Sequence, residues 1–481
     1  MIGGMRPSGP SDAVSETANG RSDRPDVVVV MTDQQRFDQI GYASAGHFET
    51  PNLDALAARG VIFERAYSAS TVCIPSRAAL LTGLQPHRVP TQENGSALRE
   101  GFWTVARAFR AAGYETALIG KMHFAPVHAE HGFETMRLCE HLFGQGLGPL
   151  SKQRGDEFDD YHDWLLERNL SEYRLGWPGR MPPRFPASAH PTAWVEREAL
   201  QFLADRDRSR PLFLVVSYPH PHPPYDAPEQ YASMYDPADS ILPSDGYEVN
   251  EQLTQVFELA TSGKLGNPQL DSRPEAKDPE KVRAFLATVR GLMKQIDDSV
   301  GRLVPKLDLD RTLLLFTSDH GDFSGHRGLM RKTPWIPFDD LARVPFFAAG
   351  LGIGAGRREP ALVQNWDLAL TCLDYAGIAA PDIDFDTRSL RPILDGRPEP
   401  ADLDRAVVCG VSILFPMVRR GRFKYMCHLD QGQPVLFDLD SDPHESRNLV
   451  DEPGFESVRD DLAEETRRAV ERPVLGVSAP A

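Results

Sequence analysis

The stretch Val27–Gln35, VVVVMTDQQ, decides the fold that this sequence is expected to adopt. It begins with an unbroken run of apolar, mostly β-branched residues and ends in polar ones. β-Branched residues pack well on a pleated surface, and an unbroken apolar run is typical of a strand covered on both faces. The stretch therefore predicts a central strand of an α/β sheet, with Asp33 and Gln34 at its carboxyl end.

Three more apolar runs resemble this strand: Tyr114–Ile119, Pro211–Ser217 and Arg311–Thr317. Helical patterns, with apolar residues at three- and four-residue spacing, lie between the runs. These patterns cover Asn52–Arg59, Trp103–Ala112, Trp194–Asp205 and Lys281–Leu303. Strands that alternate with helices predict a large mixed, mainly parallel sheet sandwiched by helices.

The length of 481 residues exceeds a single small core, so we expect a large domain and a smaller one. Residues 1–25 lack the apolar run of a signal peptide and are expected to form a disordered arm. Residues 26–395 are expected to form the α/β domain. Short strands with turns, such as Phe423–Cys427 and Val435–Asp438, predict a C-terminal subdomain over residues 396–481 with a small antiparallel sheet and a helix. Two Pro- and Gly-rich stretches are expected to be long loops or insertions: Gly144–Ser188 and Pro237–Pro279.

Composition limits the partners of this chain. Asp plus Glu (69) exceed Lys plus Arg (52), which gives a formal net charge of −17 and argues against nucleic acid. An anionic substrate would need a local basic pocket. No apolar stretch approaches a membrane span, so no membrane partner is expected. The few, widely spaced cysteines predict neither a disulfide framework nor a zinc cluster, and favour a cytoplasmic location. The oligomeric state is open, and a homo-oligomer is compatible with the sequence.

Polar residues follow each of the four predicted strands. They are Asp33 and Gln34, Lys121 and His123, His220 and His222, and Asp319 and His320. Ligands bind beyond the carboxyl ends of strands in open α/β sheets, so we expect these side chains at one edge. Carboxylates, an amide oxygen and an imidazole suit Ca²⁺, Mg²⁺ or Mn²⁺. The alternative is that Asp33 and Asp319 are turn or helix-capping residues.

The segment Cys73-Ile74-Pro75-Ser76-Arg77 has the features of a helix start. Pro and Ser suit a first turn, where exposed N–H groups and the helix dipole favour an anion. A cysteine at this position has a lowered pKa. The alternative is a cysteine that is merely packed.

This segment, extended to CIPSRAALLTG, resembles the sulfatase signature, whose cysteine is oxidised by a maturation enzyme to formylglycine. Other segments resemble the family in the same order along residues 25–449. They are VVVVMTDQQRFDQIGY, TPNLDALAARGVIFERAYS, GKMHF, PHPPY, TSDHGDFSGHRGL and GRFKYMCHLDQGQPVLFDLDSDPHESRNL.

The resemblance implies an alkaline-phosphatase-like fold and one divalent metal. Its ligands would be Asp33, Gln34, Asp319, His320 and formylglycine 73. Many relatives carry Asp where this chain has Gln34 and Asn where it has His320. Ca²⁺ is the expected ion, with Mn²⁺ or Mg²⁺ as alternatives.

The resemblance also implies roles for other side chains. Arg77 would brace the formylglycine hydrate and the metal ligands, and Asn94 would hydrogen-bond the sulfate or the hydrate. Lys121 and Lys332 would neutralise sulfate oxygens, although Lys332 by position alone is typical of a solvated charge. Four histidines complete the expected set: His222, alone or with Lys332, as proton donor to the leaving alcohol; His123 as proton acceptor; His87 as support; and His220 as a bystander.

The implied function is hydrolysis of a sulfate monoester of a small organic alcohol or phenol, through a covalent sulfo-enzyme intermediate on formylglycine 73. The partners would be a small-molecule substrate and, during maturation, the formylglycine-generating enzyme. One alternative is a phosphonate monoester or phosphodiester hydrolase of the same superfamily, against which GKMHF favours sulfate. Another is a non-catalytic binding protein with Cys73 unconverted. Three aromatic residues line a pocket or are packing residues: Tyr225, Tyr231 and Trp335.

Overall fold

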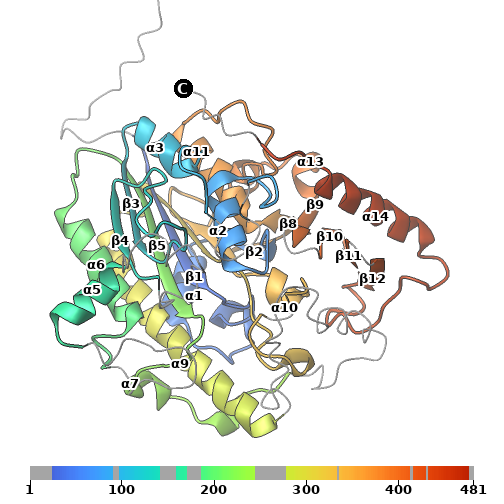
Figure 1. Cartoon of the computed structure of the whole chain (residues 1–481), viewed down its shortest axis with the longest axis horizontal. Coiled ribbons are helices and arrows are strands. Elements are labelled where there is room, and N and C mark those ends of the chain that lie inside the picture. The colour runs from blue at the N-terminus through green and yellow to red at the C-terminus, as the bar shows by residue number, and fades with distance from the viewer. Residues whose placement is uncertain are drawn as a thin grey trace, which may run out of the picture.

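The computed structural model describes residues 24–89, 91, 97–140, 159–170, 186–243, 278–332, 335–411, 415–429 and 432–475. The larger sheet in this part of the chain has eight strands in the order β4-β3-β5-β1-β6-β7-β2-β8 (Figure 1). Their bounds are β1 Asp26–Asp33, β2 Gly60–Tyr67, β3 Glu115–Gly120, β4 Thr135–Leu138, β5 Leu212–Pro221, β6 Thr312–Ser318, β7 Phe346–Ala349 and β8 Arg357–Gln364. Among the described strands of this sheet, β7 alone runs antiparallel to its neighbours. The prediction of a mixed, mainly parallel sheet is confirmed.

Strand β1 lies between β5 and β6 and is buried along its whole length. Its side chains alternate between two apolar layers, with Val27 and Val29 in one layer and Val28 and Val30 in the other. Because side chains of a strand point to opposite faces, a strand between two apolar layers needs an unbroken apolar run. This explains the sequence VVVV.

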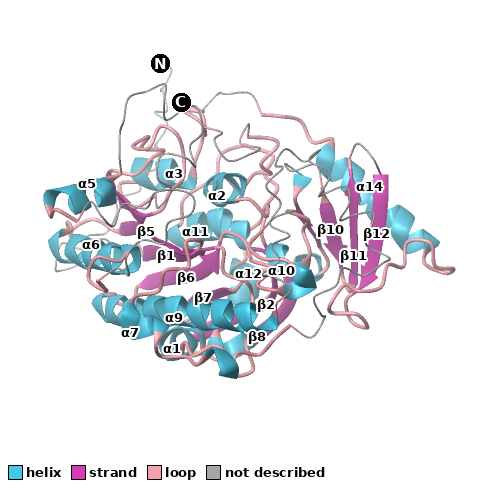
Figure 2. Ribbon diagram, turned by 60° about the horizontal axis from the view of Figure 1, so that its bottom comes forward, coloured by secondary structure: helices cyan, strands magenta, loops and turns pink. Residues whose placement is uncertain are grey.

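Helices cover both faces of the sheet (Figure 2). One apolar layer includes α2 (Cys73–Thr82), α3 (Val105–Ala111) and α11 (Leu368–Ala376). The other includes α1 (Pro51–Ala57), α5 (Asp160–Glu167), α6 (Pro191–Asp205) and α9 (Pro279–Leu303). Shorter helices are α7 Glu229–Ala232, α10 Asp339–Ala342, α12 Arg391–Leu394 and α13 Pro400–Leu403. None of the helices within the described ranges is both long and apolar enough to cross a bilayer.

A separate four-stranded antiparallel sheet lies towards the C-terminus, in the order β12-β11-β10-β9. Its strands are β9 Ala406–Cys409, β10 Met417–Arg420, β11 Phe423–His428 and β12 Gly432–Asp438, and helix α14 (Glu456–Val470) packs on one face. The other face packs against the α10 region through a shared apolar cluster. Within this contact the buried Lys424 Nζ lies 2.8 Å from Asp339 Oδ1 and 2.6 Å from Glu445 Oε1. A buried ammonium with two carboxylates anchors this sheet to the larger part of the molecule.

All four predicted strands and all four predicted helices are present, with ends that differ by a few residues. The expectation of a long loop over Gly144–Ser188 is wrong in part, because α5 lies within it. Helix α5 is short, and Asp159 caps its first turn by accepting the backbone N–H of His162. Most of Pro237–Pro279 lies outside the described residues. The boundaries at 25/26 and 395/396 stay predictions.

Candidate active site

The carboxyl ends of the central strands place the predicted polar residues together. β1 pairs in register with β6 up to Thr32 and Ser318, so Asp33 and Asp319 leave the sheet side by side. On the other side of β1, Asp33 pairs with Pro221, directly before His222. The expectation that these residues meet at one edge of the sheet is confirmed.

Helix α2 begins at Cys73, which is fully buried. It ends at Gly83, whose φ of 64° is the left-handed conformation that glycine favours after a helix. The hydroxyls of Ser68 and Ser76 both donate to the backbone carbonyl of Asp319, at 2.5 and 2.6 Å. The first turn of α2 is thereby fixed against the end of β6.

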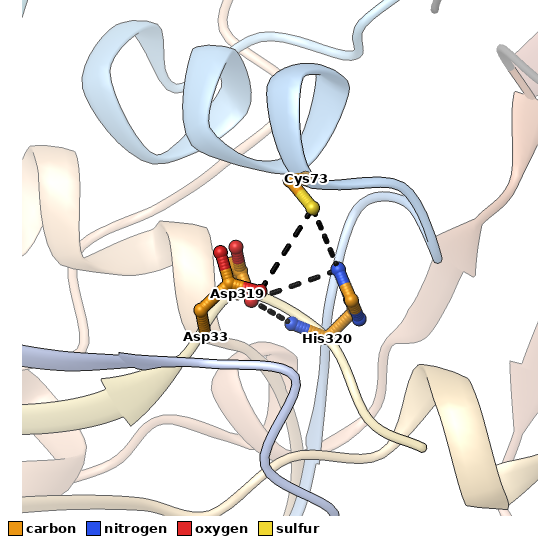
Figure 3. Close-up of side chains that lie close together, drawn as sticks. All are labelled: Asp33, Cys73, Asp319 and His320. Carbon is orange, nitrogen blue, oxygen red and sulfur yellow. Dashed lines mark hydrogen bonds and ion pairs between the residues drawn. The ribbon is translucent and has the colours of Figure 1, made fainter. Parts of the chain in front are cut away.

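Four side chains from β1, α2 and the segment after β6 converge: Asp33, Cys73, Asp319 and His320 (Figure 3). Their ligand atoms all lie within 4.8 Å of one another. Cys73 Sγ lies 3.1 Å from His320 Nε2 and 3.9 Å from Asp33 Oδ1. Four of the five predicted ligands therefore form one compact, buried cluster.

Arg77 links the two carboxylates. Its Nε donates to Asp319 Oδ2 at 2.8 Å and its Nη2 to Asp33 Oδ2 at 3.1 Å. Nη1 donates to the backbone carbonyl of Lys121 and to Ser217 Oγ, at 2.7 and 3.0 Å. The planar guanidinium thus holds three strand ends in fixed positions.

The two aspartates of the cluster have pKa values shifted in opposite directions. Burial and the Cys73 charge would raise the pKa of Asp33, but Lys121, His222 and Arg77 bring it below its usual range. By contrast, burial and the charge of Asp33 raise the pKa of Asp319. Two adjacent buried carboxylates therefore ionise together only at a cost, which a divalent cation would remove.

A divalent cation fits the donor atoms of this cluster. Oδ2 of each aspartate bonds Arg77, whereas Asp33 Oδ1 lies 3.9 Å from Cys73 Sγ. Gln34 Oε1 is buried and has no hydrogen-bond partner among the described residues. Its amide nitrogen donates to Asp322 Oδ2 at 2.5 Å, so the oxygen is the end left for an ion. Carboxylate and amide oxygens with one imidazole suit Ca²⁺, Mn²⁺ or Mg²⁺.

Two lysines bring positive charge to the cluster. Lys121 Nζ lies 2.5 Å from Asp33 Oδ2, and Lys332 Nζ lies 2.7 Å from Cys73 Sγ. Burial alone would raise the pKa of the Cys73 thiol, but Lys332, Lys121 and His320 bring it well below its usual value. Lys332 is therefore part of the cluster, and the alternative of a solvated surface charge is wrong.

The two expected proton-transfer histidines also lie beside Cys73, because Cys73 raises the pKa of each. Burial, and then the charge of Lys121, lowers the pKa of His123 to about 3, which keeps its imidazole neutral. Burial lowers the pKa of His222 as well, although Asp33 opposes this effect. His222 Nδ1 lies 2.8 Å from the carbonyl oxygen of Pro223. Because a carbonyl only accepts, Nδ1 carries a proton.

Three other expectations have mixed outcomes. Asn94 lies outside the described residues. His87, expected to support the site, instead has its Nε2 3.2 Å from the carbonyl oxygen of Arg472 near the C-terminus.

Tyr225 is more than a packing residue, because its hydroxyl donates to Asp322 and accepts from Gln34 Nε2. Tyr231 is buried and donates to Asp298 Oδ2, and the Trp335 carbonyl accepts from Thr71.

Sequence reasoning missed two supporting carboxylates. Asp322 fixes the Gln34 amide, and Glu140 Oε1 accepts the backbone N–H groups of Met122 and His123 at 3.1 and 3.0 Å. Burial raises the pKa of Glu140 to about 7. Asp322 follows the predicted strand β6, so the rule that found Asp319 could have found it. Glu140 follows β4, which the sequence did not predict.

Comparison with known proteins adds an independent finding. The sequence model of the family described as Sulfatase matches residues 25–378. The chain is 32% identical to an arylsulfatase of Clostridium perfringens, over 89% of this chain and 90% of the relative. It is 31% identical to a choline-sulfatase of Rhizobium meliloti, over 89% and 83%. The structure is similar to the phosphonate monoester hydrolase of Agrobacterium radiobacter, with a TM-score of 0.76 and 26% identity over 93% and 95%.

Proposed function

The chain belongs to the sulfatase family of sulfate ester hydrolases, and from this we propose that it hydrolyses sulfate monoesters of small organic alcohols or phenols. The observation that carries the proposal is the position of residue 73. It opens helix α2 and lies between a pair of buried carboxylates and the ammonium group of Lys332. A nucleophile here would have cations on the side from which an anionic ester arrives. Family membership also goes against a non-catalytic binding protein.

We propose that Cys73 is converted to formylglycine, and that the maturation enzyme of the family is a partner during synthesis. In the structure, Cys73 Sγ stands where the aldehyde oxygen, or the hydroxyls of its hydrate, would lie. The hydrate offers two hydroxyls on one carbon, one to attack sulfur and one to release sulfate afterwards. The contacts of Sγ with His320 and Lys332 show which groups would surround those hydroxyls.

The proposed metal ligands are Asp33, Gln34, Asp319, His320 and residue 73, with Ca²⁺ as the first candidate ion and Mn²⁺ or Mg²⁺ as alternatives. When bound, the ion would supply positive charge to a sulfate oxygen and acidify a neighbouring hydroxyl. Arg77 bonds both aspartates and would hold them in place around the ion. His320 Nδ1 lies 2.9 Å from the carbonyl oxygen of Gly321, which leaves Nε2 as the ligand atom.

The chain's own residues would bind the sulfate and move the protons. Lys332 lies next to residue 73 and is partly exposed, so it can meet a sulfate oxygen. Lys121, which forms an ion pair with Asp33, would help to neutralise the negative charge of the sulfate. Asn94 is proposed as a further hydrogen-bond donor to the sulfate. His123, held neutral by burial, would accept the proton that is lost when sulfate is released.

His222 would protonate the leaving alcohol oxygen. Its Nδ1–H stays on the carbonyl of Pro223, so the proton to be delivered must be carried by Nε2 of an imidazolium. Burial disfavours that imidazolium in the free protein. The negative charge of a bound sulfate would raise the pKa of His222, so that protonation accompanies substrate binding.

Phosphonate monoesters form a second candidate substrate class. The phosphonate monoester hydrolase of Agrobacterium radiobacter is similar over nearly the whole chain. The Lys121 and His123 pair, from the GKMHF segment, supports sulfate instead. The oligomeric state and a cytoplasmic location stay predictions from the sequence.

The test compares rates of one preparation whose conversion at residue 73 has been verified by mass spectrometry of the peptide Thr71–Arg77. The substrates are a sulfate monoester, a phosphonate monoester and a phosphodiester with the same alcohol. We expect the largest kcat/KM for the sulfate monoester and no turnover by Cys73→Ala. A larger kcat/KM for the phosphonate monoester would refute the sulfate assignment.

A further inference from the structure

A second cluster of potential metal ligands lies apart from residue 73. His190 caps the start of α6, His220 lies near the end of β5, and Asp226 lies in the loop that follows β5. All three are buried, and their ligand atoms lie within 4.8 Å of one another. Helix α6 and strand β5 lie side by side, so two elements and a loop meet at this point (Figure 1).

The distances within this cluster are compatible with a shared metal ion. Asp226 Oδ1 lies 3.1 Å from His220 Nε2, which is also the length of an ordinary hydrogen bond, and 3.7 Å from His190 Nε2. The second distance is too long for a hydrogen bond, which spans about 2.7–3.2 Å. Ligands at about 2.0–2.1 Å from one tetrahedral ion are about 3.4 Å apart. The two observed separations lie on either side of that value.

The hydrogen bonding of Asp226 also suits a bound ion. Asp226 Oδ2 is buried and has no hydrogen-bond partner within the described part of the chain. The imidazole rings of His190 and His220 lie 4.4 Å apart, so that their Nε2 atoms approach the same carboxylate.

One contact competes with a metal ion. The backbone N–H of Thr192 donates to His190 Nδ1 at 3.3 Å, which places the ring proton on Nε2. An ion on Nε2 would require the proton on Nδ1, and this bond would be lost. At 3.3 Å the bond is long, and its loss costs less than two imidazole ligands contribute.

We propose that His190, His220 and Asp226 form a second divalent-cation site, of the zinc class. Two imidazoles and one carboxylate are a borderline-to-hard donor set that zinc accepts, with water in a fourth position. The site would be structural. The bound ion would hold together the two ends of the loop from His220 to Asp226. This loop contains His222 and Tyr225, which lie at the first cluster.

The experiment measures the metal content of the full chain by elemental analysis after growth with zinc and removal of loosely bound metal. We expect two divalent ions per wild-type chain. Asp226→Asn, which keeps the shape of the side chain, should lose the zinc and keep the other ion. Asp319→Asn should keep the zinc and lose the other ion, which shows that the zinc does not occupy the cluster at residue 73.

X-ray absorption at the zinc edge of Asp319→Asn gives a second readout on protein with the native second cluster. We expect a nitrogen and oxygen shell with two imidazoles and no sulfur. Wild-type and Asp226→Asn chains with equal zinc content, or a zinc shell without imidazole, would overturn the proposal and leave a hydrogen-bonded cluster. Failure of the sulfatase proposal would appear in ester turnover and would not change the zinc count.

Discussion

Replacing Arg77 by methionine tests whether the two aspartates form a cation site. The substitution removes the guanidinium from Asp33 and Asp319, at 3.1 and 2.8 Å, inside a fully buried cluster. Breaking a buried ion pair by removing one partner costs about 3–5 kcal/mol. Asp33 keeps Lys121 at 2.5 Å, so Asp319 is the group left uncompensated, and we expect the lower end of this range in metal-free protein.

A bound divalent ion should reduce that cost. An ion present at 100 times its Kd stabilises the folded chain by about 2.7 kcal/mol, and it would supply the charge that Asp319 has lost. The assay is chemical unfolding of wild type and Arg77→Met, each metal-free and with saturating Ca²⁺ or Mn²⁺. We expect the difference in unfolding free energy to shrink by at least about 1 kcal/mol when metal is added.

The matched control is Arg405→Met. Arg405 Nη1 forms an equally close pair with buried Asp367, at 2.6 Å, and neither residue is a proposed metal ligand. The unfolding free energy that is lost in Arg405→Met should be the same with and without metal. The reasoning is refuted if Arg77→Met costs less than about 1 kcal/mol, or if metal leaves its cost unchanged as in the control.

The remaining predictions concern residues 73, 222 and 140. Cys73→Ser should give at most one turnover and gain the mass of one sulfate group, because serine lacks the second hydroxyl; repeated turnover would contradict the mechanism. His222→Asn should slow alkyl sulfate hydrolysis by about 10²–10⁴-fold and slow sulfates of acidic phenols much less; equal losses on both would rule out His222 as proton donor. Glu140 has a pKa of about 7, above its ordinary 4.5, so the folded state holds one more proton than the unfolded state between these values and stability falls as pH rises. Glu140→Gln should remove up to about 3 kcal/mol of that pH dependence, measured by unfolding from pH 5 to 8; an unchanged slope would contradict the assignment.

The central strands and the site could be predicted because they obey one simple rule. Each buried parallel strand is an unbroken apolar run, and the polar residues after it meet at one edge. Asp33 and Asp319, 286 positions apart, are neighbours for this reason. The α2 start was predictable from local chemistry, since Pro75 and Ser76 suit a first helical turn.

What the sequence did not reveal depends on tertiary contacts. β7 and β4 are four residues long, too short for a periodic pattern. Glu140 was missed with β4, because a residue at the end of an unrecognised strand has no predicted position. The contact of His87 with Arg472 depends on where the C-terminal segment packs, and no local pattern encodes that.

The most direct test of the central claim is anomalous diffraction from crystals of the converted protein grown with Mn²⁺. We predict one manganese peak about 2.0–2.6 Å from oxygen atoms of Asp33, Asp319 and residue 73, with formylglycine density at that residue. Crystals that hydrolyse a sulfate ester but show no ion between these side chains would contradict it.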